Sequence, residues 1–386
     1  MVIAKSVVVL ALAICFYIYA GYPLLIWIMS RLRHHPVLRQ AYRPGVSFIV
    51  PVYNEAAVVA QKIRNCLALE YPREKLEILV VSDGSTDSTG SIVQSFDRQD
   101  VRLLALERQG KARALNEAVR RARHEILVFS DANSILEPRS LIQLVESFAD
   151  PRVGGVCGNQ RYRPRPGTDT TAKGENLYWS FDKWLKSLES RFGSIFAADG
   201  SLYGIRRELY VPIEDPAQAD DIAISTRVVL QGYRLLYEPE AVTFEDPPVE
   251  ARAEFWRKVR VTNHSVRALL NLKGALWSSG FYSIELLSHK LFRHLMPFAL
   301  IPLFILNVPV APSHVFFQAL LYLQALFYAL ALAGYGLRHS GVGRGKVLSV
   351  PYYFCLANAA ALLGVLDILR GKRVRAWSPR SGSAVL

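Results

Sequence analysis

Residues 46–55, with the sequence VSFIVPVYNE, establish the fold class of this chain. The stretch begins almost entirely apolar and ends in an aromatic ring, an amide and a carboxylate. Short apolar strands that alternate with helices are typical of a parallel sheet covered on both faces. We therefore predict a strand over 46–53 and a helix over 54–69, as the first unit of an α/β domain.

The following segments repeat this alternation. In open α/β sheets, ligands bind beyond the carboxyl ends of the strands. We therefore expect the carboxylates, turn residues and cations that follow these strands to meet at one edge of the sheet. The predicted strands are 76–82, 101–106 and 125–130, the helices are 86–96 and 111–122, and the polar clusters are SDGSTD at 82–87, GKAR at 110–113 and DAN at 131–133.

These side chains suit a nucleoside diphosphate. The carboxylate of Asp83 can accept hydrogen bonds from a base or a ribose, and Lys111 and Arg113 can meet phosphate charge. Asp131, after the fourth strand, can hold a divalent metal that bridges the phosphates. The chain has neither a Walker A motif nor a Gly-x-Gly-x-x-Gly loop, so the usual phosphate loops are excluded.

Each of these residues also has a purely structural interpretation. The sequence DGS at 83–85 suits a tight turn, and Asn54 suits a helix N-cap. Any one of them alone favours the structural interpretation. Their occurrence at four successive strand ends is what favours ligand binding.

A charge-free segment over 7–29 is long enough to span the hydrocarbon core of a bilayer. Arg31, Arg33 and Arg39 follow it and only Lys5 precedes it, so the positive-inside rule places the following domain in the cytoplasm. A cleaved signal peptide is the alternative, but the apolar run is too long and no small-residue cleavage site follows.

Three further apolar segments, 298–310, 315–337 and 347–366, come near the C-terminus. Three spans would place the basic tail outside, against the positive-inside rule, unless one segment is re-entrant or interfacial or the rule is broken here. The predicted organisation is an N-terminal span (1–30), a cytoplasmic α/β domain (44–271), an amphipathic interface helix (275–295), a region of two or three spans (296–370) and a basic tail (371–386). An ordinary amphipathic helix of the soluble part is the alternative for 275–295.

Composition agrees with a protein that is partly in the membrane and partly in water. Of 386 residues, 51% are hydrophobic and 20% charged, which excludes a disordered chain, and the mean hydropathy is +0.17. The four cysteines are far apart, so neither a zinc site nor a disulfide framework is predicted. The net charge of +13 raises the possibility of nucleic-acid binding, but the basic clusters at 31–43 and 370–380 favour anionic membrane lipids, and no nucleic-acid partner is expected.

The motifs PVYNE at 51–55, DGSTD at 83–87 and DAN at 131–133, in this order, resemble family 2 glycosyltransferases of the GT-A fold. The membrane flanks resemble the branch of hyaluronan, chitin and poly-N-acetylglucosamine synthases. The resemblance covers most of the chain. It implies a Rossmann-like, mostly parallel sheet and an inverting transfer of a sugar from a nucleotide-sugar, usually a UDP-sugar, to a polysaccharide or lipid-linked acceptor.

The resemblance also implies which residues bind the donor. Asp131 and Asn133 take the place of the Asp-x-Asp motif, which holds the diphosphate and a divalent cation, Mg²⁺ or Mn²⁺. Because Asn133 is a neutral oxygen donor where the family has an aspartate, we expect weaker metal binding. The implied nucleotide-sugar-binding residues are Pro51, Tyr53, Glu55, Asp83, Lys111, Asp131 and Arg260.

The acceptor side is implied by two further motifs. Asp199 and Gly200 lie in FAADGSLY at 196–203, which resembles the family segment that shapes the acceptor site, and Asp220 and Asp221 resemble its paired acidic motif. Asp221 is the expected catalytic base and Asp220 an acceptor-binding residue, since a carboxylate must take the proton of the acceptor hydroxyl. Adjacent carboxylates raise each other's pKa. The alternative is that one of them caps a helix over 222–231.

Processive family members carry Gln-x-x-Arg-Trp near the membrane, and RKVRV at 257–261 is the matching stretch. Arg260 is kept and is expected to stabilise the leaving diphosphate. Val261 replaces the tryptophan that stacks under the acceptor sugar, which weakens the prediction of long-chain synthesis. Trp256 has the wrong offset and is more typical of an aromatic anchor at the membrane interface.

The leading hypothesis is a membrane enzyme that makes a cell-surface polysaccharide or its oligosaccharide unit. The multi-span C-terminal region favours processive elongation, whereas the missing tryptophan favours addition of a single sugar to a lipid-linked or growing acceptor. A non-catalytic nucleotide-sugar sensor is a weaker alternative, because both Asp131 and Asp221 are present. The sequence leaves the donor sugar, the acceptor, the linkage and any protein partner open.

Overall fold

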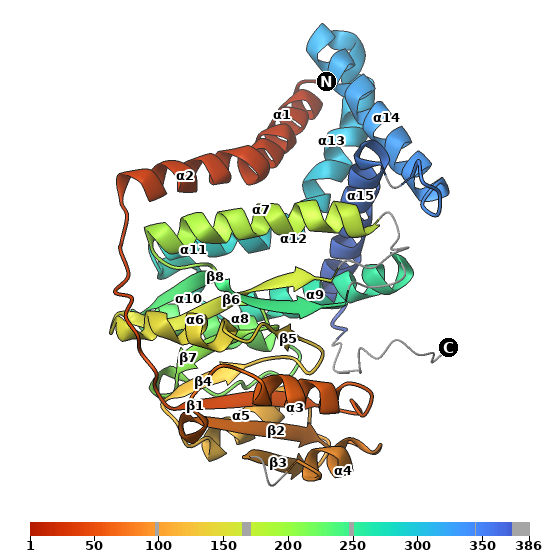
Figure 1. The fold of residues 1–386 in the computed structure, drawn as a ribbon. Helices are drawn as coiled ribbons and strands as arrows, with labels where there is room; N and C mark the ends of the chain where they lie inside the picture. Colours follow the sequence, from red (N-terminus) through yellow and green to blue (C-terminus); the bar gives the residue numbers. More distant parts are fainter. Residues whose placement is uncertain (97–99, 164–170, 247–250, 344, 373–386) are drawn as a thin grey trace. The chain divides into compact units, whose positions relative to one another are not determined.

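The computed structural model describes residues 1–96, 100–163, 171–246, 251–343 and 345–372 (Figure 1). The chain forms two compact units. The sheet unit comprises Arg33–Arg163 and Glu189–Asp246. The helical unit comprises Met1–Leu32 with the described residues of 164–188 and 247–373.

A mixed sheet is the centre of the sheet unit. The strand order is β3-β2-β1-β4-β7-β6-β8-β5. The neighbours β3, β2, β1 and β4 run parallel, as do β6 and β8, whereas β7 is antiparallel to both β4 and β6, and β5 is antiparallel to β8. The predicted α/β class with a mostly parallel sheet is therefore confirmed. The strands are β1 (Val46–Val52), β2 (Leu76–Asp83), β3 (Val101–Leu106), β4 (Ile126–Phe129), β5 (Ile135–Leu136), β6 (Val153–Tyr162), β7 (Tyr203–Arg206) and β8 (Arg234–Glu245).

Helices cover both faces of this sheet, which explains why β1 and β2 are buried at every position and mostly apolar. Phe48 of β1 belongs to a core that includes Ile63 of α3, while its neighbour Ile49 belongs to a second core that includes Leu115 of α5. Successive side chains of a strand point to opposite faces, so each needs an apolar partner. The helices of the sheet unit are α3 (Val59–Leu67), η2 (Arg73–Lys75), α4 (Thr89–Gln94), α5 (Lys111–Arg121), α6 (Ser140–Glu146), η4 (Ser147–Ala149), η5 (Arg207–Leu209) and α8 (Asp220–Leu230).

Two helices begin later than predicted, and one of them is α4, expected from residue 86 but starting at Thr89. The helix expected over 54–69 is α3, which starts at Val59 after a Val58 cap. Asn54 does not cap it: its φ is +51°, and its Oδ1 accepts a hydrogen bond from the backbone N–H of Thr86 at 2.8 Å. The N-cap interpretation of Asn54 is therefore wrong, because the residue joins two loops instead.

The helical unit carries the candidate membrane segments. Among its described residues, Val2–Leu32, Val315–Gly336 and Lys346–Leu369 are long and apolar enough to cross a membrane. Phe281–Leu295 and Pro297–Ser313 pass the same test together but are bent by 52°, which makes them a broken span or a re-entrant pair. The elements are α1 (Val2–Phe16), η1 (Tyr17–Gly21), α2 (Tyr22–Leu32), α7 (Thr171–Phe192), α9 (Ala251–Leu270), α10 (Ala275–Ser278), α11 (Phe281–Glu285), η6 (Leu286–Leu291), α12 (Phe292–Leu295), α13 (Pro297–Val310), η7 (Ala311–Ser313), α14 (Val315–Gly336) and α15 (Lys346–Leu369).

The segment 275–295, predicted as one amphipathic helix, is divided into α10, α11, η6 and α12. Its basic side chains His289 and Arg293 both contact the carboxylate of Asp182 on α7, at 3.0 Å and 3.1 Å. They pack within the helical unit, whereas an interface helix would expose them. The location of this segment at the membrane surface and the predicted domain limits stay predictions, and residues 373–386 of the basic tail lie outside the described residues.

Candidate active site

A turn over 130–134 follows β4 and carries Asp131 and Asn133. The backbone N–H of Asp131 donates to the carbonyl of Gly200 at 3.2 Å, and the N–H of Ser134 donates to the carbonyl of Asp131 at 3.2 Å. These bonds fasten the turn to the loop before β7. Both Asp131 and Asn133 are half-buried at this edge of the sheet.

Lys111 brings together two carboxylates that are far apart in the sequence. Its Nζ lies 3.0 Å from Oδ1 of Asp131 and 3.1 Å from Oδ2 of Asp220. Lys111 is the first residue of α5, and Gly110 before it has a φ of +97°, a left-handed conformation that favours glycine. Burial opposes the charge of Lys111, but Asp131 and Asp220 outweigh it, so the pKa of Lys111 is raised and its ammonium stays charged.

Asp131, Asp220 and Asp221 form an acidic cluster, and Gly200 lies between Asp131 and Asp221. A Cβ atom on Gly200 would lie 3.5 Å from Oδ2 of Asp131 and 3.7 Å from Oδ2 of Asp221. Its lack of a side chain therefore leaves open the space between the predicted diphosphate-binding residue and the predicted base. Asp199 is half-buried beside it, and its backbone N–H donates to Sγ of Cys157 at 3.3 Å.

Asp221 has the ionisation expected of a general base. Burial and the charge of neighbouring Asp220 raise the pKa of Asp221 to about 7, against the opposing charge of Lys111. Neither aspartate is the N-cap of α8, because Ala219 precedes the helix and Asp220 begins it. Asp221 nevertheless bonds the first turn of α8, because its Oδ1 accepts from the backbone N–H of Ile222 at 2.8 Å, so the capping alternative stays beside the role of base. A carboxylate with a pKa near neutral suits proton transfer at physiological pH.

The nucleoside side of the edge is organised by Asp83, whose side chain is fully buried. Its Oδ1 accepts from the backbone N–H groups of Gln109 and Gly110 at 2.7 Å and 2.9 Å, and Arg108 lies 3.3 Å from Oδ2. The guanidinium of Arg108 stacks on Tyr53, 3.1 Å from the ring centroid. Asp83 thus holds the loop 108–110 over Tyr53. Sequence reasoning missed Arg108, although it stands three residues before Lys111.

The first two motifs are joined by hydrogen bonds between their loops. The carboxylate of Asp87 accepts from the backbone N–H groups of Ala56 and Thr89, at 3.1 Å and 3.0 Å. Glu55 is buried, and its N–H donates to Oγ1 of Thr89 at 2.9 Å. Pro51 is buried within β1 opposite Val81. Glu55 and Pro51 are thus both less accessible than Asp87, which is exposed.

Residues 47–211 match the family model described as Glycosyl transferase family 2. This region is therefore similar to family 2 glycosyltransferases. The predicted resemblance is therefore confirmed on a segment that contains all three motifs. Asp220 and Asp221 follow the matched segment in α8, and the structure brings Asp220 to Lys111 within it.

Curated relatives of the glycosyltransferase domain are poly-beta-1,6-N-acetyl-D-glucosamine synthases. Those of Staphylococcus aureus (strain COL) and Staphylococcus epidermidis are each 29% identical over 221 residues, which is 55% of this chain and 52% of the relative. The chain thus spans about half the length of the curated relatives it matches. Among solved structures, mannosyltransferase PcManGT from Pyrobaculum calidifontis, in complex with GDP-Man and Mn²⁺, has a TM-score of 0.70 and 27% identity, covering 92% of this chain and 99% of that one.

The oxygen donors of the glycosyltransferase domain fit part of a metal shell. Asp131 supplies a carboxylate and Asn133 an amide, both of which suit Mg²⁺ or Mn²⁺. Within the described part of the chain, no group of three or more His, Cys, Asp and Glu side chains is placed to hold a metal ion. The remaining ligands must come from donor phosphates and water.

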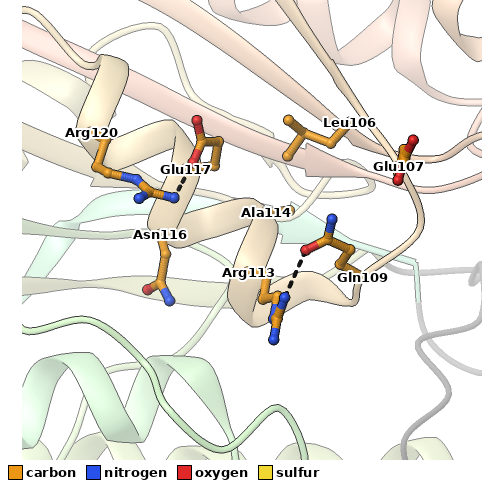
Figure 2. A pocket seen from close by; sticks show the side chains of 8 residues that line it. All are labelled: Leu106, Glu107, Gln109, Arg113, Ala114, Asn116, Glu117 and Arg120. Atoms are coloured by element: carbon orange, nitrogen blue, oxygen red, sulfur yellow. Dashed lines mark hydrogen bonds and ion pairs between the residues drawn. The ribbon is translucent and has the colours of Figure 1, made fainter.

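The two remaining predicted residues are Arg260 and Arg113. Arg260 is on α9, in the helical unit, and its role in donor binding stays a prediction. Arg113 lines a separate groove beside α5, where it donates to Oε1 of Gln109 at 3.0 Å (Figure 2). Arg120 and Glu117 pair with each other in the same groove. Arg120 is thus paired with a carboxylate, whereas the partner of Arg113 is a neutral amide.

Proposed function

We propose that the protein is a membrane glycosyltransferase that moves a sugar from a nucleotide-sugar to an acceptor in the synthesis of a cell-surface polysaccharide or its oligosaccharide unit. The observation that carries this proposal is the meeting of Asp131, Lys111 and the Asp220–Asp221 pair around Gly200, in and beside the region similar to family 2 glycosyltransferases. This arrangement supports a diphosphate site next to a base.

The proposed reaction is a single displacement with inversion at the anomeric carbon. The acceptor hydroxyl gives its proton to Asp221 while its oxygen bonds to the sugar, and the bond from that sugar to the nucleoside diphosphate breaks. Lys111 and Asp131 face the diphosphate, and Lys111 stabilises charge on the leaving group. A divalent cation, held by Asp131 and Asn133 with the phosphates, would neutralise further charge there.

Addition of a single sugar is the second candidate, and two side chains of α9 favour it. Arg257, at the position of the processive glutamine, donates to both oxygens of Glu254, at 2.6 Å and 2.9 Å. Val261, at the position of the sugar-stacking tryptophan, is exposed and offers no aromatic face. The apolar helices of the helical unit favour elongation coupled to the membrane, so product length decides between the two.

The proposed setting is an integral membrane protein with the glycosyltransferase domain in the cytoplasm. Three candidate spans among the described residues support the first part. The arginines after Leu32 support the orientation, because basic residues favour the cytoplasmic side. Membrane lipids and a saccharide or lipid-linked acceptor are the expected partners.

Nucleotide release by the full-length protein in detergent tests the proposal, with UDP- and GDP-sugars, Mg²⁺ or Mn²⁺, and lipid extract as the acceptor source. We expect release with one donor, reduced by roughly 10²–10⁴-fold in Asp221→Asn, with donor affinity little changed. Release from no donor, or equal release by the variant, would refute the assignment. Products analysed for length separate a polymer from a single added sugar.

A further inference from the structure

Lys62 is a fully buried lysine directly beneath the turn that carries Asp131. Its side chain extends from α3 and has no exposed surface. Nζ donates to Oγ of Ser130 at 2.7 Å and to the backbone carbonyl of Ser134 at 2.6 Å. It also lies 5.4 Å from the centroid of the Phe48 ring. Two hydrogen-bond acceptors and the face of an aromatic ring thus surround the terminal amino group of Lys62.

The two acceptors are the first and last residues of the 130–134 turn, so Lys62 holds both ends. Ser130 extends this hydrogen-bond chain, because its Oγ donates to the carbonyl of Ser201 at 2.6 Å. The loop that contains Gly200 and Ser201 is also bonded to Asp131 through the Gly200 carbonyl. A single ammonium therefore fixes the Asp131 turn and, through Ser130, the loop beside Asp221.

A buried carboxylate balances this charge on the other side of Ser134. The Oγ of Ser134 donates to Oε1 of Glu245 at 2.6 Å, and Gln160 donates to Oε2 at 2.8 Å. Ser134 thus links the cation and the anion, one through its carbonyl and the other through its hydroxyl. Burial lowers the pKa of Lys62, while the charges of Glu245 and Asp131 oppose that shift.

Packing alone does not require a cation here. Burying an amino group that can carry a charge is costly even when it is paired, and an apolar side chain of similar volume is often as stable. A methionine would fill the space between α3 and the turn, but it would leave the Ser134 carbonyl and the Ser130 hydroxyl without their donor. The hydrogen bonds that hold the 130–134 turn therefore explain why a lysine, and not an apolar residue, is buried here.

We propose that Lys62 is a positioning residue of the donor site, which holds the 130–134 turn so that Asp131 meets the donor diphosphate. The inference rests on the proposed function. Misplacing a ligand-holding group by about 1 Å can cost about 10²-fold in activity, and removing the partner that orients such a group typically costs about 10–100-fold in affinity or activity.

A double-mutant cycle on nucleotide affinity tests the proposal. Calorimetry on the full-length protein in detergent would measure the Kd of UDP and of GDP in Mn²⁺ for the wild type, Lys62→Met, Asp131→Asn and the double variant. We expect Lys62→Met to raise Kd by roughly tenfold or more, and by less than about threefold when Asp131→Asn is already present. If Lys62 only supported the fold, Lys62→Met would raise Kd by the same factor with and without Asp131→Asn.

Asn65→Ala is the matched control. Asn65 lies on the same helix and exchanges two hydrogen bonds with Leu136 of β5, at 2.8 Å and 2.9 Å, without touching the 130–134 turn. It is expected to lower Tm while leaving Kd within about threefold of the wild type. If Lys62→Met fails to fold, Ser130→Ala replaces it, because that change removes one Lys62 acceptor and the bond to Ser201.

The outcomes separate the two proposals. Nucleotide binding by the wild type with an unchanged Kd in Lys62→Met, or with equal factors in both backgrounds, overturns the role of Lys62 alone. Failure of the wild type to bind either nucleotide overturns the proposed function and this inference with it. A Kd raised equally by Asn65→Ala would show that loosening of α3 is sufficient, and would also overturn the inference.

Discussion

The ammonium of Lys111 lies 3.1 Å from the Oδ2 atom of Asp220, so the first residue of α5 contacts the first residue of α8. Because the same Nζ also contacts Asp131, one lysine offsets the repulsion between carboxylates from two elements. Without a ligand, the acidic cluster therefore contains its own cation. A donor diphosphate must draw Lys111 away from the carboxylates, and a divalent cation must compete with it for Asp131.

Lys111→Met is predicted to have opposite effects on metal and on nucleotide. Mn²⁺ alone should bind more tightly, because the carboxylates lose their internal cation. UDP or GDP with Mn²⁺ should bind roughly tenfold or more weakly, because a phosphate contact is lost. Mn²⁺ titration by EPR and calorimetry of the nucleotide measure the two. Arg113→Met, in the α5 groove, is the control, and a loss of both affinities in Lys111→Met would contradict this account.

The pH dependence of the reaction should report Asp221. Because a base must be ionised, kcat/KM should rise with pH through the Asp221 pKa of about 7 and level off above it. Lys111 lowers that pKa, so Lys111→Met should move the acidic limb to higher pH. Initial rates between pH 5 and 9 measure the shift. An acidic limb near pH 4 would mean that Asp221 is not the group that takes the proton.

Asp221→Asn is predicted to stabilise the protein at alkaline pH. An aspartate with an ordinary pKa of about 3.9 in the unfolded chain and about 7 in the folded protein favours folding only while it is protonated. This contribution is complete below pH about 3.9 and is lost as the pH rises through about 7. The Tm of Asp221→Asn should therefore exceed that of the wild type by roughly 2–5 °C at pH 8 and by less at pH 5.

The Glu117→Gln variant in the α5 groove is the control for this comparison, since it also replaces a carboxylate with an amide. Its difference in Tm from the wild type measures the effect of replacing a carboxylate outside the site by an amide. Equal differences for Asp221→Asn at both pH values would show that the Asp221 carboxyl has an ordinary pKa.

The sequence predicted the chemistry of the strand ends better than the contacts between them. Mostly apolar runs located β1 and β2, since a strand covered on both faces is buried along its whole length. The gathering of the polar residues at one edge of the sheet followed from the parallel direction of these strands alone. The bond of Lys111 to Asp220 depends on where α8 packs, and no local pattern encodes that position.

Lys62 and Asp83 also show that local sequence does not determine the partners of a polar side chain. Lys62 is a polar residue in a short amphipathic helix, where an exposed lysine is the ordinary expectation, and only the tertiary structure places it under the turn. Asp83 was expected to contact a base or a ribose, which stays a prediction, and its carboxylate also binds the backbone of the 108–110 loop. Its residue type indicated a site, but its partner was decided by the fold.

Gly84→Ala is predicted to weaken nucleotide binding by moving that loop. Gly84 has a φ of +67°, and a Cβ there would lie 2.6 Å from the backbone nitrogen of Arg108, so Arg108 must leave its position on Tyr53. The strain should cost about 1–3 kcal/mol of stability, and the Kd of UDP or GDP with Mn²⁺ should rise. Gly90→Ala, in α4 with open space around its Cβ, should instead gain about 0.5–1 kcal/mol and leave Kd unchanged. Equal Kd values for the two variants would mean that the Arg108 loop does not contribute to nucleotide binding.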